Sequence, residues 1–381
     1  MKLMHLSDLH IGIRVNGFSM HEDQQYIFNE IINIAGEEKP DAVIIAGDIY
    51  DKTVPPAESV QLFDRFLTGL AERKLPVFAI SGNHDSAERV SFGTRLMSSS
   101  GIHISPVFSG EVENVVMHDE HGAVRIWLLP FVKPATVRRF YTDREILSYN
   151  DAVAAVIGNM DINPDERNLL VCHQFITGAV TSDSEQSIAG GIENVDAALF
   201  DDFDYVALGH IHRPQKVVRD QIRYCGTPLK YSFSEAAHQK SVTFVTLEEK
   251  GNVTISERPL APLRDMREIR GSYDEITLRD NYAKTNTSDY LRITLTDEED
   301  IPDAIGKLRS IYPNIMDIKY DNARTRATYT VEGAVDADNK SPLELFGELY
   351  ELQMGSKMTD EQTEFVSSLI DGIWEGKNET D

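Results

Sequence analysis

Residues 41–51 read DAVIIAGDIYD, an apolar run that stops at a Gly-Asp pair and a second aspartate. Two other apolar runs end in the same way: residues 3–10 read LMHLSDLH and residues 76–85 read PVFAISGNHD. Such runs, separated by amphipathic stretches, are typical of strands in a layered α/β protein, where the carboxyl ends of several strands converge. The sequence therefore predicts strand ends that present oxygen and nitrogen ligands to one site.

Two later runs add imidazole groups to this set. Residues 168–173 read NLLVCH and residues 204–212 read DYVALGHIH. Further strands are expected at 124–129 and 241–247. A mixed set of Asp, His and Asn suits Mn²⁺, Fe or Zn²⁺ better than Ca²⁺ or a metal selected by thiolates.

The composition is that of a folded protein with more than one domain. The chain has 381 residues, of which 41% are hydrophobic and 26% charged, and this length favours two or three domains. The sequence shows neither an apolar stretch of membrane-spanning length nor a secretory signal, so we expect a cytoplasmic protein. Cys172 and Cys225 are too few for a disulfide framework and lack metal-site spacing.

The charge balance limits how the chain could bind nucleic acid. It has 37 basic and 62 acidic residues, for a formal net charge of −25. A basic surface alone is therefore excluded as the means of holding a polyanion. For such a substrate, metal ions or a partner would have to supply the positive charge.

The pattern changes after Pro262, where apolar runs flank a helix-like stretch at 304–311 and predict a small second α+β domain. The runs lie at 269–276, 290–295 and 315–320. We divide the chain into residues 1–262, 263–335 and 336–381.

The part at 336–381 contains two sequence patterns that are typical of helix N-termini. Ser341 with Glu344, and Thr359 with Gln362, have the spacing of capping boxes, and Pro342 occupies a first helical position. The two predicted helices share a broad apolar stripe made of Leu343, Phe346, Leu349, Tyr350, Phe365, Leu369, Ile370, Ile373 and Trp374. The stripe either packs against the chain itself or docks a partner helix.

Taken together, the strand ends resemble the ordered motifs of the calcineurin-like metallophosphoesterase superfamily: D-x-H, G-D-x-x-D, G-N-H-D, a lone H and G-H-x-H. The resemblance implies an α/β (α+β) fold, a β-sandwich flanked by helices, with a small α+β capping domain and a C-terminal helical hairpin. It also implies two divalent metal ions between the strand ends. The implied ligands are Asp8, His10 and His212 for one ion, Asn83, His173 and His210 for the other, and Asp48 as the bridge.

The resemblance further assigns two catalytic groups. His84 follows a ligand and would protonate the leaving oxygen or stabilise the pentacoordinate state. Asp51 matches the carboxylate that orients this histidine, the alternative being a turn residue that bonds its own loop. Two cations at such a site would aim a hydroxide at phosphorus and neutralise charge on its oxygens.

Within the superfamily, the chain resembles the double-strand-break repair nucleases. This closer resemblance rests on four stretches: Pro55-Pro56, the sequence SDSE at 182–185, YCGTPLKYSFSE at 224–235, and the entry to the capping domain at 259–271. This branch implies a Mn²⁺-dependent DNA endonuclease and 3′–5′ exonuclease that acts in recombination, replication and repair, including cleavage of hairpins or palindromes.

The same branch implies an assembly. The hairpin at 336–381 would dock an SbcC-like coiled-coil ATPase, and the chain would form a homodimer within a heterotetramer through helices near 60–70 and 89–97. Arg14, Lys52 and Arg89 would touch DNA phosphates, or else are surface charges.

Two alternatives stay open. A stand-alone metallophosphatase or cyclic-nucleotide phosphodiesterase would use the same chemistry without needing the region after residue 265. A metal-stabilised scaffold that cuts nothing predicts the loss of a ligand or of His84, and the sequence keeps both.

Overall fold

The computed structural model describes residues 1–185, 193–322, 325, 341–354 and 357–375. Among these residues no helix is both long and apolar enough to cross a membrane. The described chain divides into two compact units. One holds Met1–Glu268, Asn286–Arg292 and Tyr312–Asp317; the other holds Ile269–Thr285, Ile293–Ile311 and the described residues from Ile318 onward. The division at 1–262, 263–335 and 336–381 stays a prediction.

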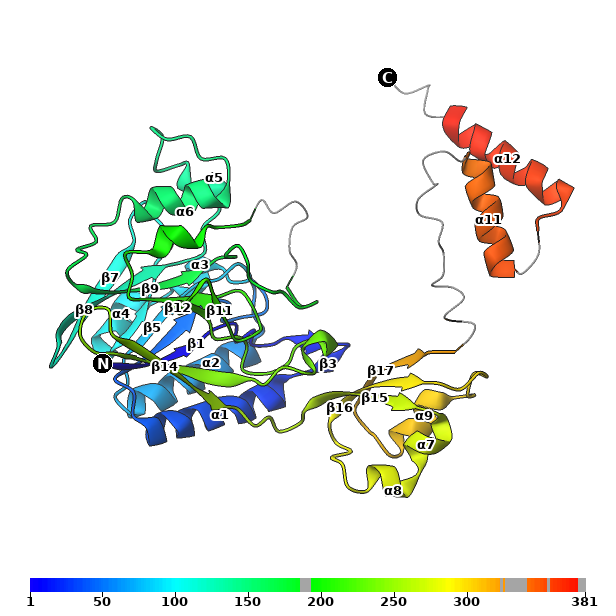
Figure 1. Cartoon of the computed structure of the whole chain (residues 1–381), viewed down its shortest axis with the longest axis horizontal. Helices are drawn as coiled ribbons and strands as arrows, with labels where there is room; N and C mark the ends of the chain where they lie inside the picture. The colour runs from blue at the N-terminus through cyan, green and yellow to red at the C-terminus, as the bar shows by residue number, and fades with distance from the viewer. Residues whose placement is uncertain (186–192, 323–324, 326–340, 355–356, 376–381) are drawn as a thin grey trace. The chain divides into compact units, whose positions relative to one another are not determined.

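The first unit contains two six-stranded sheets, both visible in Figure 1. In each sheet four neighbouring strands run parallel and the remaining two pair antiparallel. The first sheet has the order β14 (Val253–Pro259), β13 (Ser241–Leu247), β1 (Lys2–Leu6), β4 (Ala42–Ala46), β5 (Val77–Ile80), β6 (Ile102–Ile104). The second has the order β11 (Gln215–Val217), β12 (Arg219–Tyr224), β10 (Tyr205–Gly209), β9 (Arg167–His173), β8 (Gly122–Leu129), β7 (Glu113–Asp119).

Alternate residues of the central strands enter different hydrophobic cores. In β4, Ile44 faces the layer between the two sheets, whereas Ile45 faces the helices. In β9, Leu169 and Leu170 divide in the same way. Because both faces of these strands are buried, they appear in the sequence as continuous apolar runs. The result is a four-layer sandwich of helices, sheet, sheet and helices, which confirms the predicted fold class.

Helices cover the two outer faces. The long helices α1 (His21–Glu38) and α2 (Ala57–Glu72) lie side by side on the first sheet, and α6 (Tyr149–Ile157) packs on the second (Figure 1). The shorter elements of this unit are β2 (Arg14–Val15), β3 (Phe18–Ser19), α3 (Ala87–Val90), α4 (Thr94–Met97), η1 (Ser98–Ser100), α5 (Pro134–Val137), η2 (Ala197–Phe200) and η3 (Phe233–Glu235).

The later part of the chain forms a three-stranded sheet with short helices. Its strands are β15 (Met266–Gly271), β16 (Tyr290–Leu295) and β17 (Ile315–Tyr320), and its helices are α7 (Tyr273–Thr277), α8 (Arg279–Tyr282) and α9 (Ala304–Arg309). The strand expected at 269–276 is corrected: it ends at Gly271, because Ser272 and Glu275 form a capping box that starts α7 instead.

The predicted helical hairpin is confirmed in its described residues. Helix α11 spans Pro342–Met354 and α12 spans Asp360–Glu375. The Glu344 amide donates to Ser341 Oγ at 3.3 Å and the Gln362 amide donates to Thr359 Oγ1 at 3.3 Å, so both capping boxes form. The side chains of Ile373 and Trp374, which we assigned to the apolar stripe, lie outside the described part.

The α1–α2 packing is a measurable contribution to stability. Phe66 in α2 is 1% exposed, and its ring centroid lies 4.9 Å from that of Phe28 in α1. We expect Phe66→Ala to lower the free energy of unfolding by about 3–5 kcal/mol in urea titrations, because it leaves a cavity at this contact. Leu147→Ala, at a residue 70% exposed, should stay within about 0.5 kcal/mol; equal losses in the two variants would contradict this account.

Candidate metal centre

The site forms where parallel strands of both sheets end. The loops after β1 and β4 run together, since the Asp8 amide donates to the Gly47 carbonyl and the His10 amide to the Asp48 carbonyl, each at 3.0 Å. Asp8, His10 and Asp48 all have positive φ angles, of 50°, 42° and 47°. Left-handed backbone at non-glycine residues costs free energy and concentrates at functional sites.

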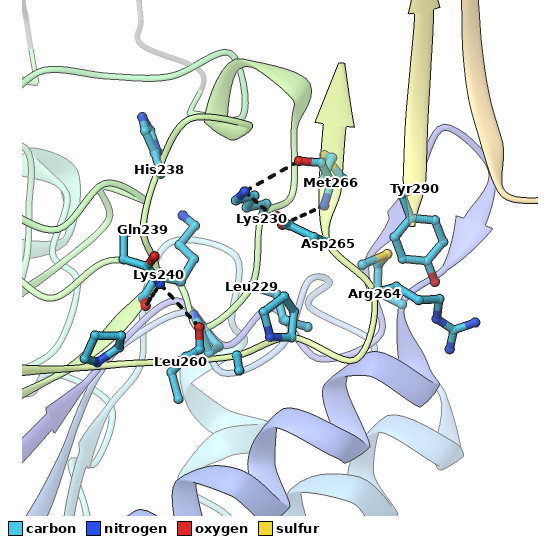
Figure 2. A pocket seen from close by; sticks show the side chains of 15 residues that line it. Leu229, Lys230, His238, Gln239, Lys240, Leu260, Arg264, Asp265, Met266 and Tyr290 are labelled. Carbon is cyan, nitrogen blue, oxygen red and sulfur yellow. Dashed lines mark hydrogen bonds and ion pairs between the residues drawn. The ribbon is translucent and has the colours of Figure 1, made fainter. Parts of the chain in front are cut away.

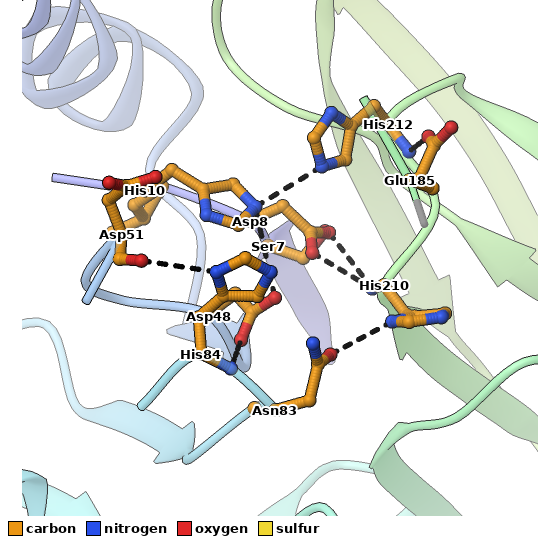
Figure 3. A network of polar contacts seen from close by, with 12 residues as sticks. Ser7, Asp8, His10, Asp48, Asp51, Asn83, His84, Glu185, His210 and His212 are labelled. Atoms are coloured by element: carbon orange, nitrogen blue, oxygen red, sulfur yellow. Dashed lines mark hydrogen bonds and ion pairs between the residues drawn. The ribbon is translucent and has the colours of Figure 1, made fainter. Parts of the chain in front are cut away.

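Three side chains form a first donor cluster, Asp8, His10 and His212, shown in Figure 3. One ligand atom from each lies within 4.8 Å of the others, and all three residues are buried. The Nε2 atoms of His10 and His212 are only 3.1 Å apart. Two imidazole nitrogens and a carboxylate that converge in this way fit a divalent cation such as Mn²⁺, Fe or Zn²⁺.

A second donor cluster consists of Asn83, His173 and His210. The Asn83 side-chain oxygen lies 2.9 Å from His173 Nε2 and 2.9 Å from His210 Nδ1. Asn83 follows β5 of the first sheet, whereas the two histidines end β9 and follow β10 of the second. The structure thus brings together the six side chains that the resemblance assigned as terminal ligands. Their roles as ligands, and their division between two ions, stay predictions.

Asp48 lies between the two clusters. Its Oδ2 atom is 3.8 Å from His10 Nε2 and 3.3 Å from His173 Nε2, and its Oδ1 accepts the His84 amide at 2.8 Å. Burial would raise the pKa of Asp48, but the charge and hydrogen bond of His173 bring it below its usual range. A carboxylate with one face toward each cluster fits a bridging ligand.

Burial and charge pull the pKa values of the cluster residues in different directions. Burial raises the pKa of the Asp8 carboxyl to about 6, against the opposing effect of His173. Burial lowers the pKa of His210 to about 3, which leaves that ring uncharged. Burial also lowers the pKa of His173, but the charge and hydrogen bond of Asp48, the Asp8 charge and the Ala46 carbonyl together outweigh burial and raise this pKa to about 9. Because ligating imidazoles must be neutral, a metal ion at His173 has to displace a proton.

His84 stands at the open side of this arrangement. It is exposed, and a hollow of about 540 Å³ is lined by His84, Asn83, Asp51 and Lys52. The His84 Nδ1 atom lies 3.1 Å from the Asp51 main-chain carbonyl oxygen (Figure 3). This corrects the expectation that the Asp51 carboxylate makes the orienting contact, because the contact with the His84 ring is made by the Asp51 main-chain carbonyl. The Asp51 amide, in turn, donates to the Ile11 carbonyl at 3.3 Å.

The three predicted DNA contacts lie at different places. Lys52 lines the hollow beside His84. Arg14 is exposed in β2 and its guanidinium donates to the Gly17 carbonyl, while Arg89 is exposed on α3. Of the three, Lys52 is the one that the structure brings next to the proposed catalytic histidine.

Asp85 fastens two ligand loops to each other. Its buried carboxylate accepts the amides of Ile49 at 3.0 Å, Tyr50 at 2.9 Å and Gly82 at 2.9 Å. Burial, followed by the nearby Asp48 charge, raises the pKa of Asp85 to about 6. The last residue of the G-N-H-D motif therefore sets the distance between the Asp48 and Asn83 loops.

A layer of polar residues behind the ligands has no counterpart among the sequence predictions. Gln24 in α1 donates to the His10 carbonyl at 2.8 Å, and Tyr231 donates to the Leu9 carbonyl at 2.8 Å. Glu185 and Glu235, from the segments 182–185 and 224–235, both contact His212. Their positions in the sequence follow no strand-end pattern, so only the fold reveals them.

The motif glycines are explained by close approach. A Cβ on Gly82 would lie 2.4 Å from the Asp48 amide nitrogen, and one on Gly47, where φ is +86°, would lie 2.3 Å from His173 Nδ1. A Cβ on Gly209 would lie 1.8 Å from the Ala46 carbonyl oxygen. Only glycine lets the two sheets and the ligand loops come this near.

Residues 1–214 match the family model described as calcineurin-like phosphoesterase, and residues 262–354 match the one described as type 5 capsule protein repressor C-terminal domain. The chain belongs to the calcineurin-like phosphoesterase family. It is 34% identical over 320 residues to the SbcD subunit of the nuclease SbcCD of Staphylococcus epidermidis, across 83% of this chain and 84% of the relative.

Two solved structures match this chain at low similarity. A dimetal phosphatase from Danio rerio is 12% identical with a TM-score of 0.40, covering 68% of this chain and 96% of that one. TT1561 of Thermus thermophilus is 12% identical with a TM-score of 0.34, covering 67% and 98%.

The close approach at Gly209 gives a direct test. We expect Gly209→Ala to lower the free energy of unfolding in urea titrations by about 1–3 kcal/mol or more, because the added methyl group overlaps the Ala46 carbonyl. As a control, Gly36→Ala lies in helix α1, with its nearest neighbour Arg73 Nε at 3.6 Å, and should be neutral or stabilising by about 0.4–1 kcal/mol. A neutral Gly209→Ala would refute the packing argument.

Proposed function

We propose that this chain is a metal-dependent DNA nuclease that acts with an SbcC-like ATPase in DNA recombination, replication and repair. The observation that carries the proposal is the pair of donor clusters with Asp48 between them and His84 beside the open hollow. The relative from Staphylococcus epidermidis, a subunit of the nuclease SbcCD, supports the choice of DNA among phosphodiesters.

In this proposal the first donor cluster and the second donor cluster would each hold one divalent ion, Mn²⁺ in preference, with Asp48 as the residue shared between them. When bound, such ions supply a nucleophilic hydroxide at neutral pH and neutralise charge on the phosphate oxygens. Asp8, Asp48 and Asn83 supply the oxygen ligands, and the histidines bind through the lone pairs of their neutral rings. Asp85 keeps the two ligand loops in register.

His84 acts on the substrate from the hollow. Its main-chain amide is fixed on Asp48 at 2.8 Å, and its ring stands edge-on to His10 with centroids 4.9 Å apart. The Asp51 carbonyl accepts a hydrogen bond from Nδ1–H, which leaves Nε2 to act on the substrate. In the doubly protonated ring, Nε2–H hydrogen-bonds the phosphate or passes its proton to the leaving oxygen, and the neutral ring then keeps its proton on Nδ1. Lys52, on the same hollow, contacts a DNA phosphate.

The proposed assembly rests on exposed apolar side chains. On the hairpin, Phe365 is 64% exposed and Leu349 is 53% exposed, which suits docking on a coiled coil. Near α3 and α4, Phe92 is 85% exposed and Leu96 is 81% exposed, which suits a homodimer. A partner that contributes basic surface would also offset the net charge of −25.

The function is tested by nuclease assay on labelled DNA. We expect the purified chain to cut single-stranded DNA with Mn²⁺, and a chelator to stop it. His84→Asn should lower the cleavage rate by about 10²–10⁴-fold, because proton transfer and phosphate contact are lost, while both Mn²⁺ ions stay bound by elemental analysis.

The control is Lys133→Gln, at an exposed residue outside the hollow, which should cut at the unmodified rate. Loss of metal in His84→Asn would show that its role is misassigned. Hydrolysis of a generic phosphodiester without cutting of DNA would instead favour a stand-alone phosphatase or cyclic-nucleotide phosphodiesterase.

The hairpin has its own test. The double variant Phe365→Asp, Leu369→Asp should weaken binding of the SbcC-like ATPase by about tenfold or more in pull-down titrations, since the charges replace exposed apolar contacts. Mn²⁺-dependent cutting by the isolated chain should be unchanged. Glu361→Gln, on the same helix, is the matched control, and full ATPase binding by the double variant would eliminate this docking site.

A further inference from the structure

A buried carboxylate outside the motifs lies behind one proposed ligand. Glu235, at the end of η3, is 0% exposed. Its Oε1 accepts the Ser184 hydroxyl at 2.6 Å and lies 3.4 Å from His212 Nδ1. The segments 182–185 and 224–235, to which the sequence pattern gave no chemical role, therefore meet at His212.

Lys240 neutralises this carboxylate. It is 4% exposed, and its Nζ donates to Glu235 Oε2 at 2.6 Å, to Thr227 Oγ1 at 2.7 Å and to the His212 carbonyl at 2.8 Å. All three ammonium hydrogens thus have acceptors. Lys240 therefore hydrogen-bonds both the Glu235 carboxylate and the main-chain carbonyl of His212.

Lys240 also lines a separate pocket of about 340 Å³, drawn in Figure 2, and no residue of the two donor clusters lines it. A second carboxylate fixes the main chain of His212, because Glu185 Oε1 accepts its amide at 2.5 Å (Figure 3). His212 is held at its amide, carbonyl and ring.

The consequence is a defined tautomer. When Glu235 accepts a hydrogen bond from Nδ1–H, the lone pair of the neutral His212 ring is on Nε2, the atom that faces His10 Nε2 at 3.1 Å. Among the described residues, the other histidines of the clusters are held differently. His173 Nδ1 bonds the Ala46 carbonyl at 2.8 Å, His210 Nδ1 lies 2.9 Å from the Asn83 side-chain oxygen, and His10 Nδ1 has no hydrogen-bond partner. Carboxylate support from behind the ring is thus confined, in this part of the chain, to the first donor cluster.

We propose that Glu235, kept ionised and in place by Lys240, is a positioning residue that tunes the first donor cluster and leaves the second donor cluster unaffected. This rests on the metal assignment of the proposed function. A carboxylate behind a ligating imidazole orients the ring and makes it a stronger ligand, and its loss typically costs about 10–100-fold in metal affinity. The two proposed ions should therefore respond differently to a change at Glu235.

The test is a Mn²⁺ titration of the full chain in which binding is measured by calorimetry and by electron paramagnetic resonance. Glu235→Gln should weaken one of two Mn²⁺ sites by about 10–100-fold and leave the other as in the unmodified chain. At a Mn²⁺ concentration that fills both sites of the unmodified chain, the spin-coupled pair signal should be replaced by that of a single ion. Two sites of unchanged affinity would overturn the proposal.

A matched control separates positioning from stability. Asp204 is also a buried carboxylate with a lysine partner, Lys250 at 2.9 Å, and it lies at the opposite end of β10 from the ligands. Asp204→Asn should lower thermal stability while both Mn²⁺ affinities persist. If it weakened one site as much as Glu235→Gln does, the effect would be general loosening and the proposal would fail.

Glu235→Gln leaves the buried Lys240 charge without its partner, which can destabilise the fold. A second variant therefore tests the proposal without an unpaired buried charge. Glu235→Gln combined with Lys240→Met removes both charges and should show the same selective loss of one site. Two intact sites in this double variant would also refute the proposal. Unmodified chain that binds two Mn²⁺ but cuts no DNA would refute the proposed function alone.

Discussion

The two sheets are tied together at their strand ends by polar groups that reach from one to the other. The Asp8 carboxylate, after β1, accepts the His210 amide, after β10, at 2.9 and 3.1 Å. His173, at the end of β9, bonds the Ala46 carbonyl of β4. These contacts require the sheets to approach at Gly209, so packing and ligand geometry depend on one constraint. A shift of either sheet would pull apart the residues within each donor cluster, since each cluster takes residues from both sheets.

The sequence was most informative where burial is complete. Strands such as β4 and β9 are covered on both faces, so they appear as unbroken apolar runs, and the polar residue that follows each run marks the carboxyl end. This is why the fold class could be predicted, and why polar residues at several strand ends were expected to converge. The division of these residues into two sets of ligands came from the family resemblance and stays a prediction. The hairpin was equally readable, because the capping chemistry of Ser341 and Thr359 is local.

The remainder depends on contacts between distant segments. Strand β7 at the sheet edge has partly exposed residues throughout and gave no apolar run. Glu235 reaches His212 only because the turn after β12 folds behind β10, and nothing in the residue itself indicates burial. The orienting atom of Asp51 proved to be a main-chain carbonyl, which no side-chain pattern encodes.

The position of β13 has a consequence for synthesis of the chain. The partner of β1 on one edge, β4, is made soon after it, but the partner on its other edge is β13, where Lys2 meets Thr246. At about 5–20 residues per second, roughly 200 residues separate these events by about 10–40 s. An apolar strand edge is open during that time, which exposes nascent chains to aggregation and to chaperones. His212 is made late in the same interval, so a cleavage-competent centre cannot assemble before the sheets are nearly complete.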